Sequence, residues 1–195
     1  MKLGLRVVAQ MLLILTSIGV YGALGALHAP GGVLTSIVLV ALLVFVAILA
    51  HELAHAAAAH WVGAHVHAIV AFPVRLRLRP RRLELIKRGA HQGGDLGGYV
   101  SYTLDRIDAR RKHAIIAAAG PLANLALALI AATVEQLFDR GGPALPGAPV
   151  SAPLIFLSAF ALLSGGLGLA NLIPYEGSDG DHIANLWRRP KRTWR

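Results

Sequence analysis

The feature that most constrains this chain is a set of four long stretches that carry almost no charge. Residues 7–27, for example, contain no Asp, Glu, Lys or Arg. A helix needs about 20 apolar residues to cross the hydrocarbon core of a bilayer. The sequence therefore predicts an all-α polytopic membrane protein, with four transmembrane helices at about 6–27, 33–60, 112–137 and 150–173.

Composition favours one membrane-embedded domain over residues 1–195. Apolar residues make up 55% of the chain and charged residues only 15%, whereas soluble domains carry about 25% charge. Lys2 and Arg6 before the first stretch also suit a signal peptide, but the apolar run exceeds the roughly 7–15 residues usual there. The absence of cysteine excludes disulfides, iron–sulfur clusters and thiolate zinc sites. Any metal ion must therefore be bound by histidine and carboxylate side chains.

The basic residues predict the orientation of the helices. Threading the four helices through a membrane places every one of the 19 Lys and Arg residues except Arg140 on the same side. By the positive-inside rule, both termini, the connection 61–111 and the tail 181–195 are cytoplasmic, in a multi-pass protein of the cell membrane. This topology and attraction to anionic lipids of the bilayer account for the net charge of +9. Nucleic acid is therefore not predicted as a partner.

The connection 61–111 contains a predicted β element at the cytoplasmic membrane surface. Residues 74–79 alternate apolar and basic side chains, a pattern typical of a strand with two unlike faces, and residues 97–103 are a candidate partner. A strand within 65–79 is suited to hold an extended peptide by main-chain pairing. The alternative is an amphipathic hairpin that lies on lipid headgroups.

The chemistry is concentrated near the inner end of the second helix, in His51-Glu52-Leu53-Ala54-His55. Residues four apart share a helix face, so both histidines can turn a ring nitrogen toward one metal ion, with Glu52 placed to take a proton from an attacking water. A carboxylate at the centre of a membrane helix costs about 2.5–3.5 kcal/mol on insertion scales, so such residues are usually functional. The motif predicts a zinc-dependent hydrolase.

A catalytic zinc site commonly has a third protein ligand. The carboxylates that follow the fourth helix at the same side of the membrane are Glu176, Asp179 and Asp181. Pro174 ends that helix, and Gly177 and Gly180 permit a turn that brings a carboxylate back toward the metal. These residues alone leave Asp179 and Asp181 as equal candidates.

Three motifs together resemble those of the site-2 proteases, intramembrane zinc metalloproteases that cut membrane-spanning substrates. They are the motif of residues 51–55, Gly120-Pro121 with Asn124 in the third helix, and Asn171, Pro174 and Asp179-Gly180 after the fourth. The similarity spans most of residues 33–185. It implies that His51, His55 and Asp179 bind Zn²⁺, that Glu52 is the general base, and that Asn171 contacts substrate or the developing oxyanion. Ser178 departs from the family pattern, which has a large apolar residue before Asp-Gly.

The predicted function is a zinc-dependent endopeptidase that cleaves membrane-spanning proteins near the cytoplasmic side. One alternative is a metal transporter, suggested by His60, His65 and His67 after the motif, although these suit an interfacial position better. The other is an inactive scaffold that binds membrane proteins, which the intact Glu52 disfavours. Asn124 suits either an interhelical hydrogen bond or the wall of a substrate cleft, and residues 165–168 suit close helix packing.

The charge distribution makes a prediction about topology. A cysteine introduced at Gly142 should react with an impermeant thiol reagent added outside intact cells. The predicted third helix ends, and the fourth begins, on the outer side of the membrane. A cysteine at Ser101, in the cytoplasmic connection, is the control and should react only after permeabilisation. Labelling of Gly142→Cys only from the cytoplasm would overturn the four-helix topology.

Overall fold

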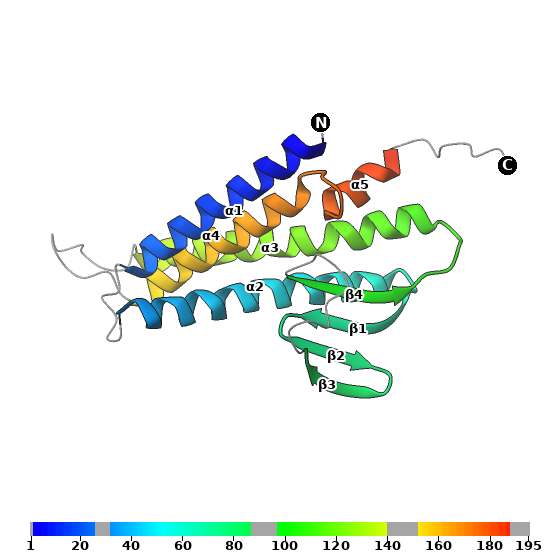
Figure 1. Ribbon diagram of the computed structural model, residues 1–195, viewed down its shortest axis with the longest axis horizontal. Helices are drawn as coiled ribbons and strands as arrows, with labels where there is room; N and C mark the ends of the chain where they lie inside the picture. The colour runs from blue at the N-terminus through cyan, green and yellow to red at the C-terminus, as the bar shows by residue number, and fades with distance from the viewer. Residues whose placement is uncertain (1, 26–31, 87–96, 140–151, 188–195) are drawn as a thin grey trace.

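The structure is a computed structural model that describes residues 2–25, 32–86, 97–139 and 152–187. Four long helices lie side by side in an elongated bundle (Figure 1): α1 (Lys2–Gly25), α2 (Gly32–Trp61), α3 (Ala109–Asp139) and α4 (Ala152–Leu172). All four are long and apolar enough to cross a membrane. The prediction of four helices long and apolar enough to span a membrane is confirmed, with each boundary within a few residues.

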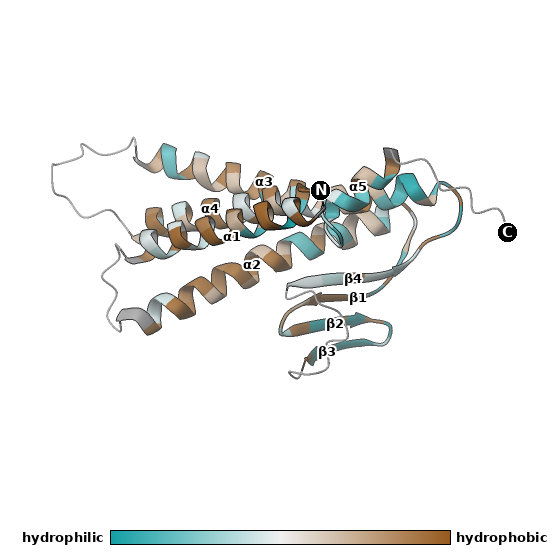
Figure 2. Cartoon of the chain, turned by 45° about the horizontal axis from the view of Figure 1, so that its top comes forward, coloured by the Kyte–Doolittle hydropathy of each residue, from teal (hydrophilic) through white to brown (hydrophobic). Residues whose placement is uncertain are grey.

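Hydrophobic residues make up most of the length of the bundle helices (Figure 2). Large side chains such as Met11, Ile14, Leu42 and Leu129 are exposed on different helices. A soluble protein rarely exposes apolar surface on this scale, whereas a lipid-facing surface requires it. Alanine is the commonest of the buried hydrophobic residues, and its small side chain lets helix backbones approach closely.

Glycines in α4 show this close packing. A Cβ on Gly166 would lie 2.6 Å from Thr16 Cγ2 of α1, and one on Gly168 would lie 2.9 Å from the backbone oxygen of Pro121 in α3. Neither distance is compatible with a side chain. The packing role predicted for residues 165–168 is therefore confirmed at these two positions.

The connection between α2 and α3 forms a four-stranded antiparallel sheet. Its strands are β1 (His65–Ala71), β2 (Val74–Leu78), β3 (Arg81–Leu85) and β4 (Gly98–Thr103), in the order β3-β2-β1-β4. The predicted strands exist, but their predicted pairing is wrong, because β1 lies between β2 and β4 and pairs with both. Since β1 and β2 are bonded on both sides, the idea that a strand within 65–79 receives a peptide is also wrong.

The sheet is attached to the bundle through β1 and β4, which contact α2, while β2 and β3 extend away from it (Figure 1). The register places Leu76 opposite Leu83 on one face, and Arg75 opposite Glu84 on the other. The alternation predicted for residues 74–79 thus produces one apolar and one charged face.

The chain does not continue as a simple tail after α4. A turn leads into a short helix, α5 (Asp179–Trp187), which packs against α3. The beginning of α1, the end of α2, the beginning of α3 and α5 all lie at the same end of the bundle (Figure 1). The predicted loop around Gly142, with Pro143, Pro146 and Pro149, lies outside the described residues.

Candidate metal and catalytic site

Two histidines of α2 point into the bundle from one helix face. His51 and His55 are 6% and 8% exposed, and their Nε2 atoms lie 3.0 Å apart. The rings are nearly perpendicular, with centroids 4.6 Å apart. The one-turn spacing read from the sequence therefore brings both ring nitrogens to one point.

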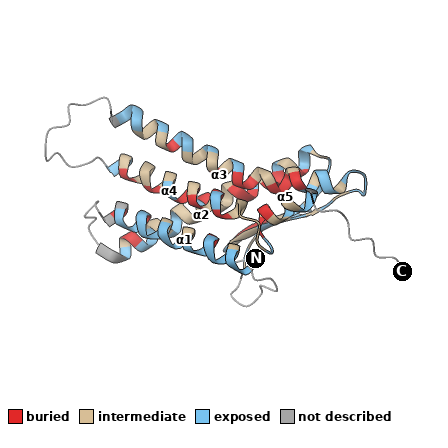
Figure 3. Cartoon of the chain, turned by 90° about the horizontal axis from the view of Figure 1, so that it is seen from above, coloured by how far each residue is buried: buried red, intermediate tan, exposed pale blue. Residues whose placement is uncertain are grey.

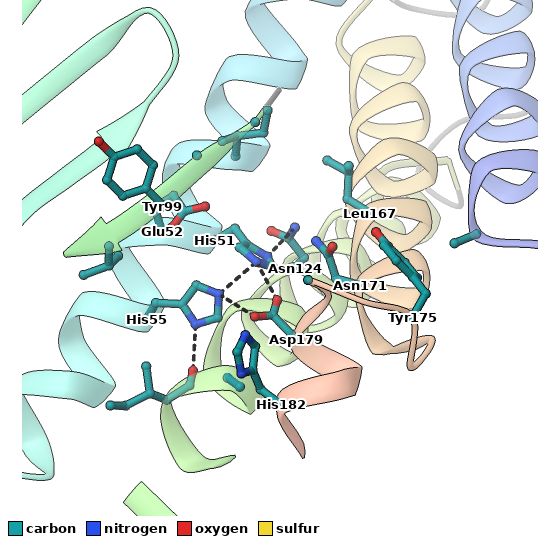
Figure 4. A pocket seen from close by; sticks show the side chains of 18 of the residues that line it. His51, Glu52, His55, Tyr99, Asn124, Leu167, Asn171, Tyr175, Asp179 and His182 are labelled. Atoms are coloured by element: carbon teal, nitrogen blue, oxygen red, sulfur yellow. Dashed lines mark hydrogen bonds and ion pairs between the residues drawn. The ribbon is translucent and has the colours of Figure 1, made fainter. Parts of the chain in front are cut away.

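Asp179, the first residue of α5, meets this pair (Figure 4). Its Oδ2 lies 3.1 Å from His51 Nε2, and its Oδ1 lies 3.4 Å from His55 Nε2. The three ligand atoms all lie within 4.8 Å of one another. Two imidazoles and one carboxylate are a donor set that zinc accepts. Among the described residues this is the one such group, and it does not include Asp181.

Ser178 sets the direction in which Asp179 points. Its buried hydroxyl donates to the backbone oxygen of Ile173 at 2.7 Å and accepts from the backbone N–H of Asp181 at 3.1 Å, as an N-cap residue does. Asp179 and Asp181 are two residues apart on α5, about 200° around the helix. The cap therefore directs the Asp179 side chain toward the histidines and the Asp181 side chain away from them.

Two glycines allow the turn before this cap to form. Gly177 has a φ of 86°, a conformation that costs little without a side chain. A Cβ on Gly180 would lie 2.9 Å from the carbonyl carbon of Ile173. The turn predicted here is present, but Gly180 contributes to it by close approach and not by an unusual φ.

The far end of α5 is fixed to α3. The Arg110 guanidinium donates to the backbone oxygens of Asn185 and Leu186, at the end of the helix. A cation is favourable at this position because the carbonyl end of a helix carries partial negative charge. With Ser178 at one end and Arg110 at the other, α5 has a defined position relative to α3.

The other nitrogen of each ring is also contacted from α3. His55 Nδ1 lies 2.6 Å from the backbone oxygen of Ile116, and His51 Nδ1 lies 3.3 Å from Asn124 Nδ2. Between them, a Cβ on Gly120 would lie 2.6 Å from His51 Nε2. Residue 120 must therefore be glycine for α3 to pack directly against the ligand atoms.

Glu52 lies on the side of α2 that faces the sheet (Figure 4). It is 5% exposed, and a Cβ on Gly98 of β4 would lie 2.7 Å from its Oε1. The side chains of Glu52 and Asp179 line a cavity of about 780 Å³ together with the two histidines. Its walls also include Asn171 and Tyr99. Buried residues are concentrated in this region, where α3 and α5 lie against each other (Figure 3).

Two groups outside the transmembrane segments have perturbed pKa values. Burial alone would raise the pKa of Asp179, but hydrogen bonds and charge from His51 and His55 outweigh it and hold this pKa below its usual value. As the pH falls through this lowered pKa, the carboxylate loses its stabilising contacts. Burial, with the charge of Asp179, raises the pKa of Tyr102, which keeps its hydroxyl protonated. The Tyr102 hydroxyl lies within hydrogen-bond distance of His113 Nδ1, at 2.8 Å.

The residues predicted from the sequence fall into two groups. His51, Glu52, His55, Asp179, Asn124 and Asn171 all line the same cavity. His60, His65 and His67 are exposed and do not belong to the metal-binding group. The sequence analysis did not identify Gly98, Tyr102 or His113, because their proximity to the site depends on how the sheet packs. Gly120 was recognised only as part of a motif.

Comparison with known proteins gives one match. The model of Peptidase family M50 matches residues 39–140, which include most of α2, the sheet and α3. The matched segment contains His51, Glu52, His55, Gly120 and Asn124, and it ends before α4 and Asp179. No curated protein and no solved structure matches the chain.

The geometry predicts one zinc ion per chain, held by His51, His55 and Asp179. Purified His55→Ala protein should lose nearly all bound zinc, as measured by elemental analysis. Asp181→Ala removes a carboxylate from the same turn of α5 and should retain zinc, because Asp181 lies outside the group of ligands. If zinc requires Asp181 and not Asp179, the assignment of the third ligand is wrong.

The close approach of α3 makes a second prediction. Gly120→Ala should sharply reduce zinc binding, because the added methyl group occupies the position of the histidine nitrogens. Gly165→Ala, in α4, is the matched control, since its Cβ would make an ordinary 3.5 Å contact with Ala128. Equal zinc content in the two purified variants would show that α3 is not held against the site.

Proposed function

The chain belongs to Peptidase family M50, whose members are membrane metalloproteases, and from this premise we propose that it is a zinc-dependent intramembrane endopeptidase. Its proposed substrates are membrane-spanning proteins, cut near the cytoplasmic side. The observation that carries the proposal is the meeting of His51 and His55 from α2 with Asp179 from α5, beside Glu52 in one cavity.

The residues present fit a zinc ion. Two imidazoles and one carboxylate are ligands that zinc accepts, and Gly120 places no side chain in front of the ring nitrogens. When bound, zinc would polarise the scissile carbonyl and lower the pKa of water toward about 7. His51, His55 and Asp179 would hold it, leaving a position open to the cavity, as catalytic sites do.

Glu52 is the proposed general base. Its carboxylate borders the same cavity, one residue along the helix from His51, and can take a proton from the water that attacks the peptide bond. It then returns the proton to the amine that leaves. Gly98 allows the β4 backbone to pass close to this carboxylate, so a peptide lying along β4 passes close to it as well.

Asn171 is the proposed contact for the substrate or the developing oxyanion. It lies near the end of α4 and lines the cavity on the side away from Glu52 (Figure 4). A side-chain amide can donate a hydrogen bond to the oxygen on which negative charge develops. Glu52 and Asn171 thus offer proton transfer and charge stabilisation from different helices.

The edge strand β4 supports an extended substrate. A transmembrane helix hides its peptide bonds in internal hydrogen bonds, so cleavage requires local unwinding. β4 is an edge strand of the sheet, and Gly98, Tyr99 and Val100 line the cavity. Main-chain pairing with β4 would stabilise an unwound segment beside Glu52. In this proposal β4 takes the role that the sequence analysis gave to residues 65–79.

The proposed orientation follows from charge. The basic residues that the structure describes lie near the beginnings of α1 and α3 and in the sheet, at the end of the bundle where the site lies. This distribution favours a cytoplasmic position for the sheet, α5 and both termini in a cell membrane. A transporter would need ligands along a path through the membrane. Among the described residues, the group at the inner end is the one candidate metal site.

Replacing Glu52 separates a peptidase from a transporter. Glu52→Gln keeps the shape of the side chain but removes the base, so zinc should remain bound while cleavage falls by about 10²–10⁴-fold. The assay uses purified protein in liposomes with a panel of membrane-spanning peptides, and mass spectrometry of the fragments. Glu84→Gln, on β3, removes the carboxylate that pairs with Arg77 of β2, away from the cavity; it is the matched control and should cleave normally.

Two outcomes would contradict this proposal. Full cleavage by Glu52→Gln would exclude Glu52 as the base. Wild-type protein that cuts none of the peptides, yet carries zinc into the liposomes, would show that the chain is a transporter.

Asn171→Ala tests the second catalytic role. The change leaves all three zinc ligands in place, so zinc content should stay at the wild-type level. Loss of one donor to a developing oxyanion typically costs about 10²–10³-fold in rate, and kcat should fall accordingly. Unchanged cleavage, or loss of zinc in parallel with cleavage, would place Asn171 outside the catalytic machinery.

A further inference from the structure

Asn124, in the middle of α3, has a side chain of which only one end has a partner. The residue is 1% exposed, and its Oδ1 has no hydrogen-bond partner among the described residues. Its Nδ2 lies 3.3 Å from His51 Nδ1. A buried amide oxygen without a partner is unfavourable and rare in folded proteins, so the position calls for an explanation.

The two histidines differ in what faces Nδ1. The Nδ1 of His55 faces the backbone oxygen of Ile116 at 2.6 Å, and a carbonyl can only accept. When this ring is neutral, Nδ1 therefore carries the proton, and Nε2 has the lone pair that a metal ion needs. The Nδ1 of His51 faces an amide NH₂, which donates. With the amide in this orientation, a neutral His51 carries its proton on Nε2, which lies 3.1 Å from Asp179 Oδ2 and can donate to it.

A metal-binding His51 needs the opposite tautomer. Its Nε2 must offer a lone pair, so the proton must move to Nδ1, which then requires an acceptor. Asn124 already stands next to Nδ1, and a half-turn of its amide exchanges Nδ2 for the unpaired Oδ1. The atom that lacks a partner in this structure is thus the atom that the other tautomer needs.

We propose that Asn124 is the positioning residue of His51, and that in the zinc-loaded protein its Oδ1 accepts a hydrogen bond from His51 Nδ1–H. This inference rests on the proposed zinc site. The backbone oxygen of Ile116 accepts a hydrogen bond from His55 Nδ1 in the same way, so residues of α3 orient both imidazoles. The rotation leaves the backbone in place, because Ser164 of α4 donates to the backbone oxygen of Asn124 at 2.9 Å.

The test is zinc affinity, measured by competition with a chromophoric chelator in detergent. Asn124→Leu keeps a similar volume but offers no acceptor, and should weaken zinc binding by about 10–100-fold. Asn124→Asp retains an acceptor in every rotamer and should bind zinc as tightly as wild type or more tightly. Ser164→Ala removes a buried hydrogen bond to the same residue without touching its amide, and should keep wild-type affinity.

Rescue by aspartate distinguishes positioning from packing. Wild-type affinity in Asn124→Leu, or a tenfold loss in folded Asn124→Asp, would overturn the proposal. A loss in Ser164→Ala as large as in Asn124→Leu would do so too, since packing would then explain both. If Asn124→Leu does not fold, the zinc affinity of Asn124→Asp alone tests the proposal. Failure of the wild type to bind zinc would instead overturn the proposed metal site, and this inference with it.

Discussion

The arrangement of this protein depends on the pairing of two buried imidazoles with one carboxylate at one end of an apolar bundle. Each of these polar groups would be costly without partners in such surroundings. His51, His55 and Asp179 satisfy one another, and α3 supplies contacts to the outer nitrogens of both rings. The helices must therefore pack at fixed positions, and the small residues of α3 and α4 make that packing possible.

The carboxylate is brought to the histidines by local structure after α4. The Ser178 cap, the positive φ of Gly177 and the contact of Arg110 with the end of α5 together hold Asp179 in position. Ser178 departs from the pattern of the site-2 proteases, where a large apolar residue is usual. Its hydroxyl gives that departure a physical reason, because it satisfies backbone groups at both sides of the turn.

The sequence predicted the helices and the histidine pair well, because both depend on local rules. Apolar length defines a transmembrane helix, and a spacing of four residues puts His51 and His55 on one face. The choice between Asp179 and Asp181 depends on the residue at which α5 begins, and no pattern within the segment revealed that residue. The pairing of the strands and the approach of Gly120 depend on contacts distant in sequence, so the sequence could not specify them.

X-ray absorption at the zinc K-edge of the purified, zinc-loaded protein tests the central claim most directly, because it reports the atoms bound to the metal. The account predicts one zinc coordinated by two imidazole nitrogens at about 2.0–2.1 Å together with oxygen ligands. The imidazole signal should disappear in a variant lacking both His51 and His55. A spectrum with oxygen ligands alone in the wild type, or one unchanged in that variant, would contradict the account.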